Sequence, residues 1–315
     1  MSRVVVATAY GGPEVLSLVE QPTGVPGPGE ALLQVRAAGI NPADWKLASG
    51  AFGADPGRLP LRLGFEAAGV VTAVGDGAEG PAGPVAVGDE VIGWPLRGAY
   101  AEELVVPATA LVPKPAGLGW AEAAGLLLTG TTAVHALTAV GVRAGDTVLV
   151  HGAAGGVGQM LVQLAVADGA RVIGTAGRSG AEVVRRWGGE PVAYGEGLAD
   201  RVRAAAPGGV TAAVDAVGTD EALDVSLELV PDRGRIATLA NFDRGPQAGI
   251  AVLGSGPGAD PGTELRSAAR HRLTALVEAG RLRVTVARAY PLAEVAAAHR
   301  DGITGHSHGK LVLVR

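Results

Sequence analysis

The sequence predicts an α/β protein with two parts, a mostly β unit followed by a parallel sheet with helices. Residues 1–114 hold short apolar runs between Gly/Pro turns, which is typical of a barrel-like β unit. From about residue 115, strand and helix patterns alternate, which indicates a parallel sheet with right-handed crossovers. At 147–165, an apolar strand passes through a glycine-rich turn directly into a helix.

The elements follow from these patterns in chain order. In the first part, apolar runs predict strands at 4–10, 16–22, 31–40, 67–75 and 89–95. In the second part, we expect strands at 146–152, 171–177, 212–218, 234–240 and 249–254, and helices at 121–137, 156–169, 181–189, 223–230 and 263–280. A strand at 284–292, a helix at 294–302 and a strand at 310–314 close the chain, and we expect this tail to return to the first unit. The predicted domains are 1–114 with 281–315, and 115–280.

The composition excludes several classes of function. Among 315 residues there is no cysteine, which excludes disulfides, thiolate nucleophiles and Cys-rich zinc sites. The net charge is −5 with scattered basic residues, so we expect no nucleic-acid partner. Residues 123–142 carry no charged side chain, but their Gly and Thr content favours a buried helix pair over a membrane span. The first apolar run is too short for a signal peptide, and we expect a cytoplasmic location.

The glycine-rich turn predicts a dinucleotide site. Gly155 and Gly158 hold the second and third positions of the G-x-G-x-x-G pattern, with Ala153 at the first. Backbone N–H groups and the positive end of the helix would approach a pyrophosphate there. The candidate residues are Gly152, Ala153, Ala154, Gly155, Gly156, Val157 and Gly158. The alternative is a glycine turn that binds no phosphate.

The following strand favours NADPH over NADH. A site for NAD has an acidic residue near the end of this strand, but here Gly177, Arg178 and Ser179 stand at that place. Arg178 would form charge-assisted bonds to the 2′-phosphate with Ser179 nearby, unless it is only a solvated arginine at a helix start. Tyr194 lies beside the adenine or has a packing role.

Along nearly its whole length the chain resembles the zinc-independent, quinone oxidoreductase-like branch of the medium-chain dehydrogenases and reductases, which includes enone and alkenal reductases. The motifs that carry the resemblance occur in the family's order: AAGINPADWKLASG (37–50), LGFEAAGVVTAVG (63–75), VGDEVIG (87–93), GAYAEELVVP (98–107), HGAAGGVG (151–158) and GKLVLV (309–314). The resemblance implies a GroES-like domain completed by the C-terminal strand, a Rossmann domain, and an active site in the cleft between them. Homodimers are frequent in that family.

The sequence departs from the zinc-dependent relatives at their metal ligands. Those relatives have Cys where this chain has Asn41, and His-Glu where it has Phe65 and Glu66. The six histidines are scattered, and His306 and His308, although close in sequence, are expected in a loop. We therefore expect no metal, and hydride transfer to a substrate that is already electrophilic.

The resemblance also assigns the remaining candidates. Asn41 is expected at the nicotinamide ribose or the substrate, Asp44 orients its neighbours or only caps a helix, and Lys46 is the candidate proton donor or oxyanion stabiliser. Further cofactor-binding candidates are Thr129, Val217, Leu239, Ala240, Asn241 and Lys310. Phe52, Trp94, Tyr100 and Phe242 are loop residues of unknown orientation near the substrate.

The leading hypothesis is NADPH-dependent reduction of the conjugated C=C of a small α,β-unsaturated ketone or aldehyde. Quinone reduction is the second hypothesis. Reduction of an enoyl thioester would need basic residues for a carrier, which the sequence does not reveal. A different class stays open as well, a non-catalytic NADPH-binding sensor or structural protein, because fold does not fix function.

Overall fold

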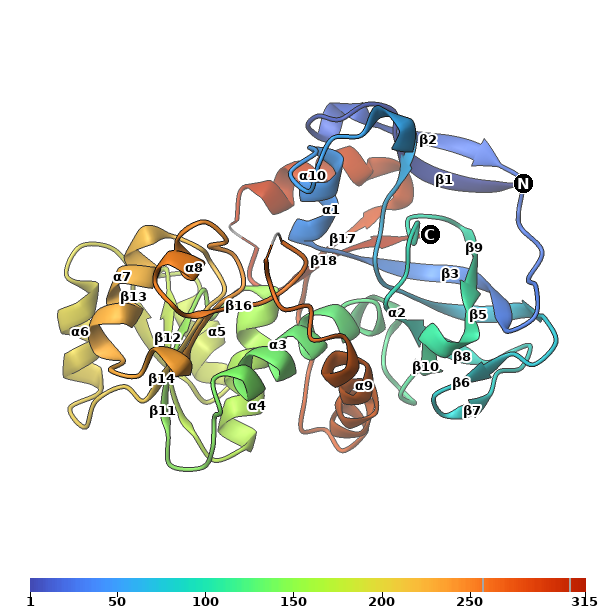
Figure 1. Cartoon of the computed structure of the whole chain (residues 1–315). Coiled ribbons are helices and arrows are strands. Elements are labelled where there is room, and N and C mark those ends of the chain that lie inside the picture. Colours follow the sequence, from blue (N-terminus) through green and yellow to red (C-terminus); the bar gives the residue numbers. More distant parts are fainter. Residues whose placement is uncertain (257, 306) are drawn as a thin grey trace. The chain divides into compact units, whose positions relative to one another are not determined.

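The computed structural model describes residues 1–256, 258–305 and 307–315. The chain divides into two compact units, Met1–Leu128 with Arg270–Arg315, and Thr129–Ala269 (Figure 1). The sequence analysis, with boundaries at 114/115 and 280/281, placed residues 115–128 and 270–280 in the second domain. The structure places them in the first unit. The C-terminal segment belongs to the first unit, as expected.

The first unit is built mainly from β-strands. They are β1 Ser2–Ala7, β2 Leu16–Gln21, β3 Glu30–Ile40, β4 Leu61–Arg62, β5 Ala67–Val74, β6 Glu79–Gly80, β7 Gly83–Pro84, β8 Glu90–Gly93, β9 Glu103–Pro107, β10 Leu111–Pro113, β17 Val286–Pro291 and β18 Lys310–Val314. One sheet has the order β2-β1-β4, and a larger sheet has the order β10-β8-β5-β3-β18-β17 with β9 also paired to β3. The α-helices wholly within this unit are α1 Pro42–Ala48, α2 Trp120–Ala123 and α10 Val295–Ile303.

The long strand β3 organises the first unit. It pairs with β5, β9 and β18, and its register against β5 shifts twice, between Leu32 and Leu33 and between Val35 and Ala37. Such bulges bend a strand and increase its twist, so β3 can pair with different strands along its length. Its last residues, 37–40, pair antiparallel with β18, which brings the end of the chain beside the residues that precede α1 (Figure 1).

The second unit is a six-stranded, fully parallel sheet. Its strands are β11 Thr147–His151, β12 Arg171–Ala176, β13 Glu190–Ala193, β14 Ala212–Asp215, β15 Ile236–Thr238 and β16 Ala251–Val252. The order β13-β12-β11-β14-β15-β16 is the Rossmann order, in which the direction of winding reverses beside the first strand, β11. The α/β fold class, with a β-barrel-type unit and a doubly wound sheet, is thereby confirmed.

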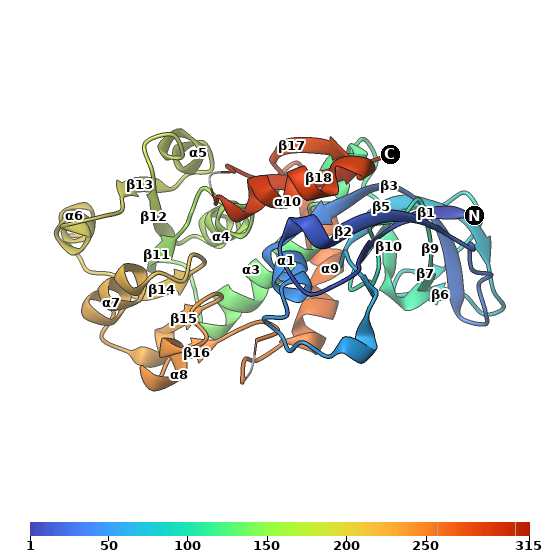
Figure 2. The ribbon, with the colours of Figure 1, turned by 90° about the horizontal axis from the view of Figure 1, so that it is seen from above.

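Helices cover both faces of this sheet. They are α3 Leu127–Ala139, α4 Gly156–Ala167, α5 Ala181–Arg186, α6 Leu198–Ala205, α7 Asp220–Leu229 and α8 Arg244–Gln247, and the beginning of α9 Thr263–Glu278 lies beside α3. Figure 2 shows α6 and α7 on one side of the strands, and α3 and α4 on the other. Leu198 and Val202 of α6 and Leu223 of α7 pack with Leu149 and Ile173 of the sheet in one apolar core.

Most predicted elements occur close to their predicted positions, with two informative differences. The sequence analysis missed β13 and α6, and it predicted one helix at 121–137 where the structure has α2 and α3 separated by residues 124–126. In the described part of the chain, no helix is long and apolar enough to cross a membrane. The uncharged stretch 123–142 therefore forms the end of α2 and the largely buried α3.

Candidate functional site

The segment after β3 carries the three predicted catalytic residues. Asn41 is the N-cap of α1, and Pro42 occupies the first turn, where its missing N–H costs nothing. The Asp44 carboxylate accepts hydrogen bonds from the Asn41 N–H at 2.8 Å and the Gly64 N–H at 3.0 Å. Asp44 therefore both caps the helix and fixes the loop before Glu66, while Lys46 follows on the last turn of the helix.

A buried ammonium group connects Asn41 with Glu66. Lys310 Nζ donates to the Ile40 carbonyl oxygen at 2.9 Å, to Asn41 Oδ1 at 2.6 Å and to Glu66 Oε1 at 2.8 Å. The Glu66 carboxylate also accepts from Asn41 Nδ2 at 3.1 Å and from the Leu128 N–H at 2.9 Å. Because all three ammonium hydrogens have acceptors, the desolvation cost of this buried ion pair is offset. The Asn41 amide is held in one orientation.

These three hydrogen bonds limit how Lys310 can contact a cofactor. The sequence analysis put Lys310 among the residues that contact the cofactor. Since its ammonium group binds three protein oxygens and is buried, none of its N–H groups is left to bind a phosphate. Lys310 therefore positions Asn41 and Glu66. Glu66 is a partner that the sequence analysis did not assign to the site, because its Lys310 contact joins residues far apart in the chain.

Burial controls the ionisation of the residues around α1. Asp44 is fully buried, and this burial raises its pKa from 3.8 to about 7, although hydrogen bonds from Asn41 and Gly64 and the charge of Lys310 oppose the rise. Tyr100 lies beside Asp44, and burial raises its pKa well above 10. A hydrogen bond between the Tyr100 hydroxyl and Asp44 also raises the pKa of Tyr100 and opposes the rise in the pKa of Asp44. Tyr100 and Trp94 are buried, so neither lines an open surface.

Lys46 has a different environment from Lys310. It is half-buried on α1, and burial lowers the pKa of its ammonium group. A lowered pKa brings an ammonium group closer to the range in which it can release a proton at neutral pH. Burial therefore makes the Lys46 ammonium a stronger acid than an exposed one, and its catalytic role stays a prediction.

In the second unit, the glycine-rich turn has the geometry expected for a phosphate site. Gly152 adopts φ +73°, and Gly155 is the N-cap of α4 with an extended backbone that any residue could adopt. A Cβ added to Gly155 would meet only the Gly152 carbonyl oxygen at 3.4 Å, so this face of the backbone is open to a ligand. A Cβ at Gly158 would lie 2.7 Å from Ala153 Cα, so Gly158 is required for close packing. The turn therefore fits a dinucleotide pyrophosphate.

Most of the other cofactor candidates of this unit lie on two groups of loops, after β12 and after β14 and β15. Arg178 and Ser179 are exposed after β12, and a Cβ added at Gly177 would lie 3.1 Å from the hydroxyl oxygen of Tyr194, so Tyr194 lies against this loop. Val217, Leu239, Ala240 and Asn241 follow β14 and β15. Val217 lies beside the glycine turn, with its Cβ 3.5 Å from a Cβ added at Gly152. Thr129 is buried in α3.

A buried histidine directly precedes the glycine turn. His151 ends β11, its Nε2 lies 3.1 Å from Ser226 Oγ, and burial lowers its pKa to about 4. Thr175 Oγ1 accepts from the Gly152 N–H at 3.2 Å. These buried polar groups support the turn. In the described ranges 1–256, 258–305 and 307–315, no three acidic or histidine side chains come together as a possible metal site, and His306 lies outside these ranges.

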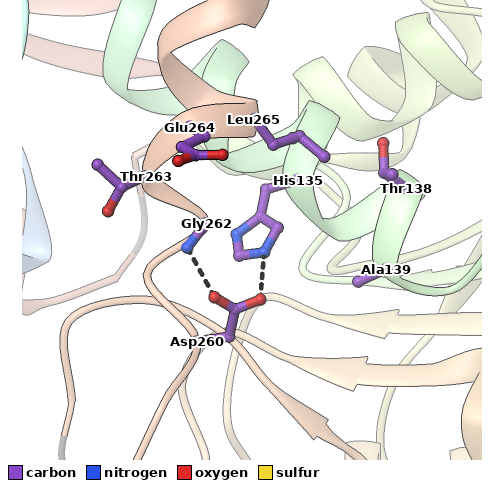
Figure 3. A pocket seen from close by; sticks show the side chains of 8 residues that line it. All are labelled: His135, Thr138, Ala139, Asp260, Gly262, Thr263, Glu264 and Leu265. Carbon is purple, nitrogen blue, oxygen red and sulfur yellow. Dashed lines mark hydrogen bonds and ion pairs between the residues drawn. The ribbon is translucent and has the colours of Figure 1, made fainter.

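A surface cavity of about 440 Å³ lies elsewhere in the second unit, between α3 and the start of α9. Figure 3 shows His135 and Asp260 facing each other there, with His135 Nε2 3.1 Å from Asp260 Oδ2. The Gly262 N–H donates to the other carboxylate oxygen at 2.9 Å. No predicted site residue lines this cavity. The His135–Asp260 contact joins α3 to the loop before α9.

Comparison with known proteins gives consistent results for both parts of the chain. A family model described as an alcohol dehydrogenase GroES-like domain matches residues 27–116, and one described as a zinc-binding dehydrogenase matches residues 187–313. A quinone oxidoreductase of Pseudomonas aeruginosa is 35% identical, with 100% of both chains covered. The structure of Escherichia coli quinone oxidoreductase complexed with NADPH has a TM-score of 0.87 at 29% identity, with 100% of both chains covered. A mycobacterial protein complexed with NADPH has a TM-score of 0.87 at 34% identity, covering 99% of this chain and 100% of its own.

The close packing of Gly158 gives a prediction about stability. Gly158→Ala should lower the free energy of unfolding by about 1–3 kcal/mol, because the new methyl group overlaps the backbone of Ala153. Gly155→Ala is the matched control, and it should stay within about 1 kcal/mol of the wild type. Urea unfolding of the three proteins measures the difference. Equal stability of the two variants would contradict the packing argument.

The raised pKa of Asp44 gives a prediction about pH. Between pH 3.8 and about 7 the folded protein retains a proton on Asp44 that the unfolded chain has lost, so the contribution of Asp44 to stability falls as pH rises through this window. Asp44→Asn does not titrate. The stability of the wild type relative to the variant should therefore decline from pH 4 to 7, with a slope of at most about 1.4 kcal/mol per pH unit.

Urea unfolding at several pH values measures this relative stability. His151 and His299, whose pKa values burial lowers to about 4, act in the opposite direction because they destabilise the fold as pH falls. Both histidines are present in both proteins, so their effects cancel in the comparison. Parallel stability profiles for the wild type and Asp44→Asn would show that Asp44 ionises at the same pH in the folded and unfolded chains.

Proposed function

Because the chain belongs to the medium-chain dehydrogenases and reductases, the NAD(P)-dependent oxidoreductases that include the quinone oxidoreductases, we propose that it is a zinc-independent, NADPH-dependent reductase. Its proposed substrate is a small α,β-unsaturated ketone or aldehyde. The observation that carries the proposal is the combination of an open glycine turn with a half-buried lysine of lowered pKa on α1.

The second unit supplies the residues that would hold NADPH. The backbone of residues 152–158 would bind the pyrophosphate, and exposed Arg178 with Ser179 would bind the 2′-phosphate. Tyr194 would lie at the adenine, and the loops with Val217 and Asn241 would lie at the nicotinamide. When bound, NADPH supplies the hydride. Two similar structures that contain NADPH support this assignment.

Lys46 and Asn41 would act on the substrate. Addition of a hydride to the β-carbon of an enone makes its carbonyl oxygen negatively charged, and the adjacent α-carbon must then gain a proton. The ammonium group of Lys46 would donate a hydrogen bond to this oxygen and release a proton to complete the reduction. The fixed amide of Asn41 would orient the reactants, since Lys310 and Glu66 prevent it from turning.

The same network supports zinc independence. The positions at which zinc-dependent relatives carry metal ligands are occupied here by Asn41 and Phe65–Glu66. The Lys310 ammonium lies within hydrogen-bond distance of the oxygens of both Asn41 and Glu66. A divalent cation could bind these oxygens only by displacing the ammonium group that they already bind. The proposed zinc independence therefore differs from the zinc-binding dehydrogenase described by the family model that matches residues 187–313.

Quinone reduction is the second candidate, and the quinone oxidoreductases among the similar proteins favour it. It would use the same cofactor residues. A quinone is a conjugated dicarbonyl, so an oxygen again gains negative charge when hydride adds. The two candidates therefore differ in the shape of the acceptor and not in the chemistry of the protein groups.

An acceptor panel tests the proposal. We expect NADPH oxidation with small enones and enals, and a fall in turnover of at least tenfold in Lys46→Met, which keeps the apolar stem but removes the charge. Lys46→Arg should recover part of the oxyanion stabilisation but not the proton donation. The measurement is absorbance at the nicotinamide band at saturating NADPH.

The other outcomes of this panel are distinct. Rapid turnover of quinones with none of enones would replace the first candidate with the second. Tight NADPH binding with no turnover of any acceptor would instead favour the non-catalytic sensor. Unchanged enone turnover in Lys46→Met would remove Lys46 from the mechanism while leaving the reductase assignment in place.

A second experiment tests cofactor choice. Arg178→Ala should weaken NADPH binding by about 10- to 150-fold, the equivalent of one charge-assisted hydrogen bond of about 1.5–3 kcal/mol, and should change NADH binding little. Arg186→Ala on α5 is the control, because it removes the same charge from an exposed site. Nicotinamide fluorescence titrations measure all affinities. Equal losses for the two cofactors would argue that Arg178 does not contact the 2′-phosphate.

A further inference from the structure

Buried polar residues stand in one row across the carboxyl edge of the parallel sheet. His151 of β11 is in register with Asp215 of β14, and Asp215 is in register with Thr238 of β15. Each is the last residue of its strand, and all three are buried. Buried polar groups on a sheet edge require hydrogen-bond partners, and the partners of Asp215 and Thr238 lie in the loops that follow.

Asp215 holds the loop after β14 to the neighbouring strand. Its Oδ1 atom accepts from the Val217 N–H at 2.9 Å and from the Gly218 N–H at 2.8 Å. Its Oδ2 atom accepts from the hydroxyl of Thr238 at 2.8 Å. One carboxylate therefore fixes the backbone of residues 217–218 and also the side chain at the end of β15.

Thr238 does the same for the loop after β15. Its hydroxyl donates to Asp215 and accepts from the Ala240 N–H at 3.2 Å and from the Asn241 N–H at 3.0 Å. The two loops also touch each other. A Cβ added at Gly218 would lie 2.8 Å from Ala240 Cβ, and Asn241 Nδ2 lies 3.4 Å from the Gly218 carbonyl oxygen.

We propose that Asp215 and Thr238 are positioning residues that hold these two loops in one relative arrangement for the nicotinamide end of the cofactor. This inference rests on the proposed NADPH-dependent function. In open parallel sheets, ligands bind outside the carboxyl ends of the strands, where both loops lie. Both side chains are buried and bonded to the backbone of these loops, so their proposed effect on the cofactor is indirect.

The position of this pair predicts a specific kinetic effect. The adenosine end of the cofactor is assigned to Arg178 and Ser179, on a different loop. Loosening residues 217–218 and 239–241 should therefore disturb the orientation of the reacting ring more than overall binding. Small misplacements of reacting groups reduce rates by up to about 100-fold. We expect kcat to fall about tenfold or more, with a change in the NADPH Kd of less than about threefold.

The chain contains a matched control at the other edge of the sheet. Thr211, directly before β14, donates to Asp146 Oδ1 at 2.9 Å, so it forms a second Thr–Asp pair at the amino ends of the strands, with Thr211 exposed where Thr238 is buried. Thr238→Val and Thr211→Val remove the same hydroxyl group from the two edges. Thr238→Ser keeps the hydroxyl and should restore wild-type behaviour.

The experiment measures three quantities for the wild type and each variant: the NADPH Kd by fluorescence, kcat at saturating NADPH, and amide hydrogen exchange of the two loops with and without NADPH. The expected result is loss of kcat and of NADPH-induced protection in Thr238→Val, with both retained in Thr211→Val and Thr238→Ser. Equal values for Thr238→Val and Thr211→Val would overturn the proposal. If Thr238→Val does not fold, Asp215→Asn, which keeps one oxygen for Val217 and Gly218, takes its place.

Failure of the proposed function gives a different pattern. If the wild type binds NADPH but reduces no acceptor, the reductase assignment fails, while hydrogen exchange of the loops still tests Asp215 and Thr238. If the wild type turns over and Thr238→Val matches it in kcat and protection, the reductase assignment stands and the positioning role is wrong. If the wild type binds no NADPH, both proposals fail.

Discussion

The buried ion pair between Lys310 and Glu66 is the interaction on which the first unit depends. Removing an ammonium and a carboxylate from water is costly, and the cost is offset only when every donor and acceptor finds a partner. Here Lys310 binds Ile40, Asn41 and Glu66, and Glu66 also binds the N–H of Leu128. The last strand, the end of β3 and the start of α3 are therefore fixed by one charge pair.

The second unit meets the same requirement without an ion pair, through one carboxylate and one hydroxyl group. Asp215 and Thr238 end neighbouring strands, and their oxygens bind the N–H groups of the following loops. In the second unit these strands end in buried polar residues that hold the next segment, and in the first unit Lys310, which begins β18, holds Asn41 directly after β3. The candidate site residues are on those segments: Asn41 follows β3, and Val217 and Asn241 follow β14 and β15. The strand ends are thus fixed by hydrogen bonds, and the segments that follow them carry the candidate functional groups.

The sequence predicted the elements whose pattern is local. The strand at Thr147–His151 and the helix at Gly156–Ala167 were predicted because apolar periodicity and glycine spacing identify them. β13 was missed because Pro191 interrupts a short run, which a sheet tolerates only at an edge strand such as this one. The polar networks could not be predicted, since Lys310 and Asn41 are 269 positions apart. A buried polar residue at the end of an apolar run, such as Asp215, is the signal that could have indicated the second network.

Lysine occurs only at positions 46, 114 and 310 in a chain that otherwise uses arginine, and the surroundings of Lys310 and Lys46 differ. At position 310, three oxygens surround one compact ammonium within 3 Å, and a planar guanidinium would direct its donors away from them. At position 46 the ammonium is half-buried and burial lowers its pKa, a change that an arginine guanidinium, which stays charged, would not undergo. Lys310 thus holds Asn41 through a buried ion pair, whereas burial makes the half-buried Lys46 ammonium a stronger acid. In the proposed reductase, Lys310 would keep Asn41 in place and Lys46 would complete the reduction.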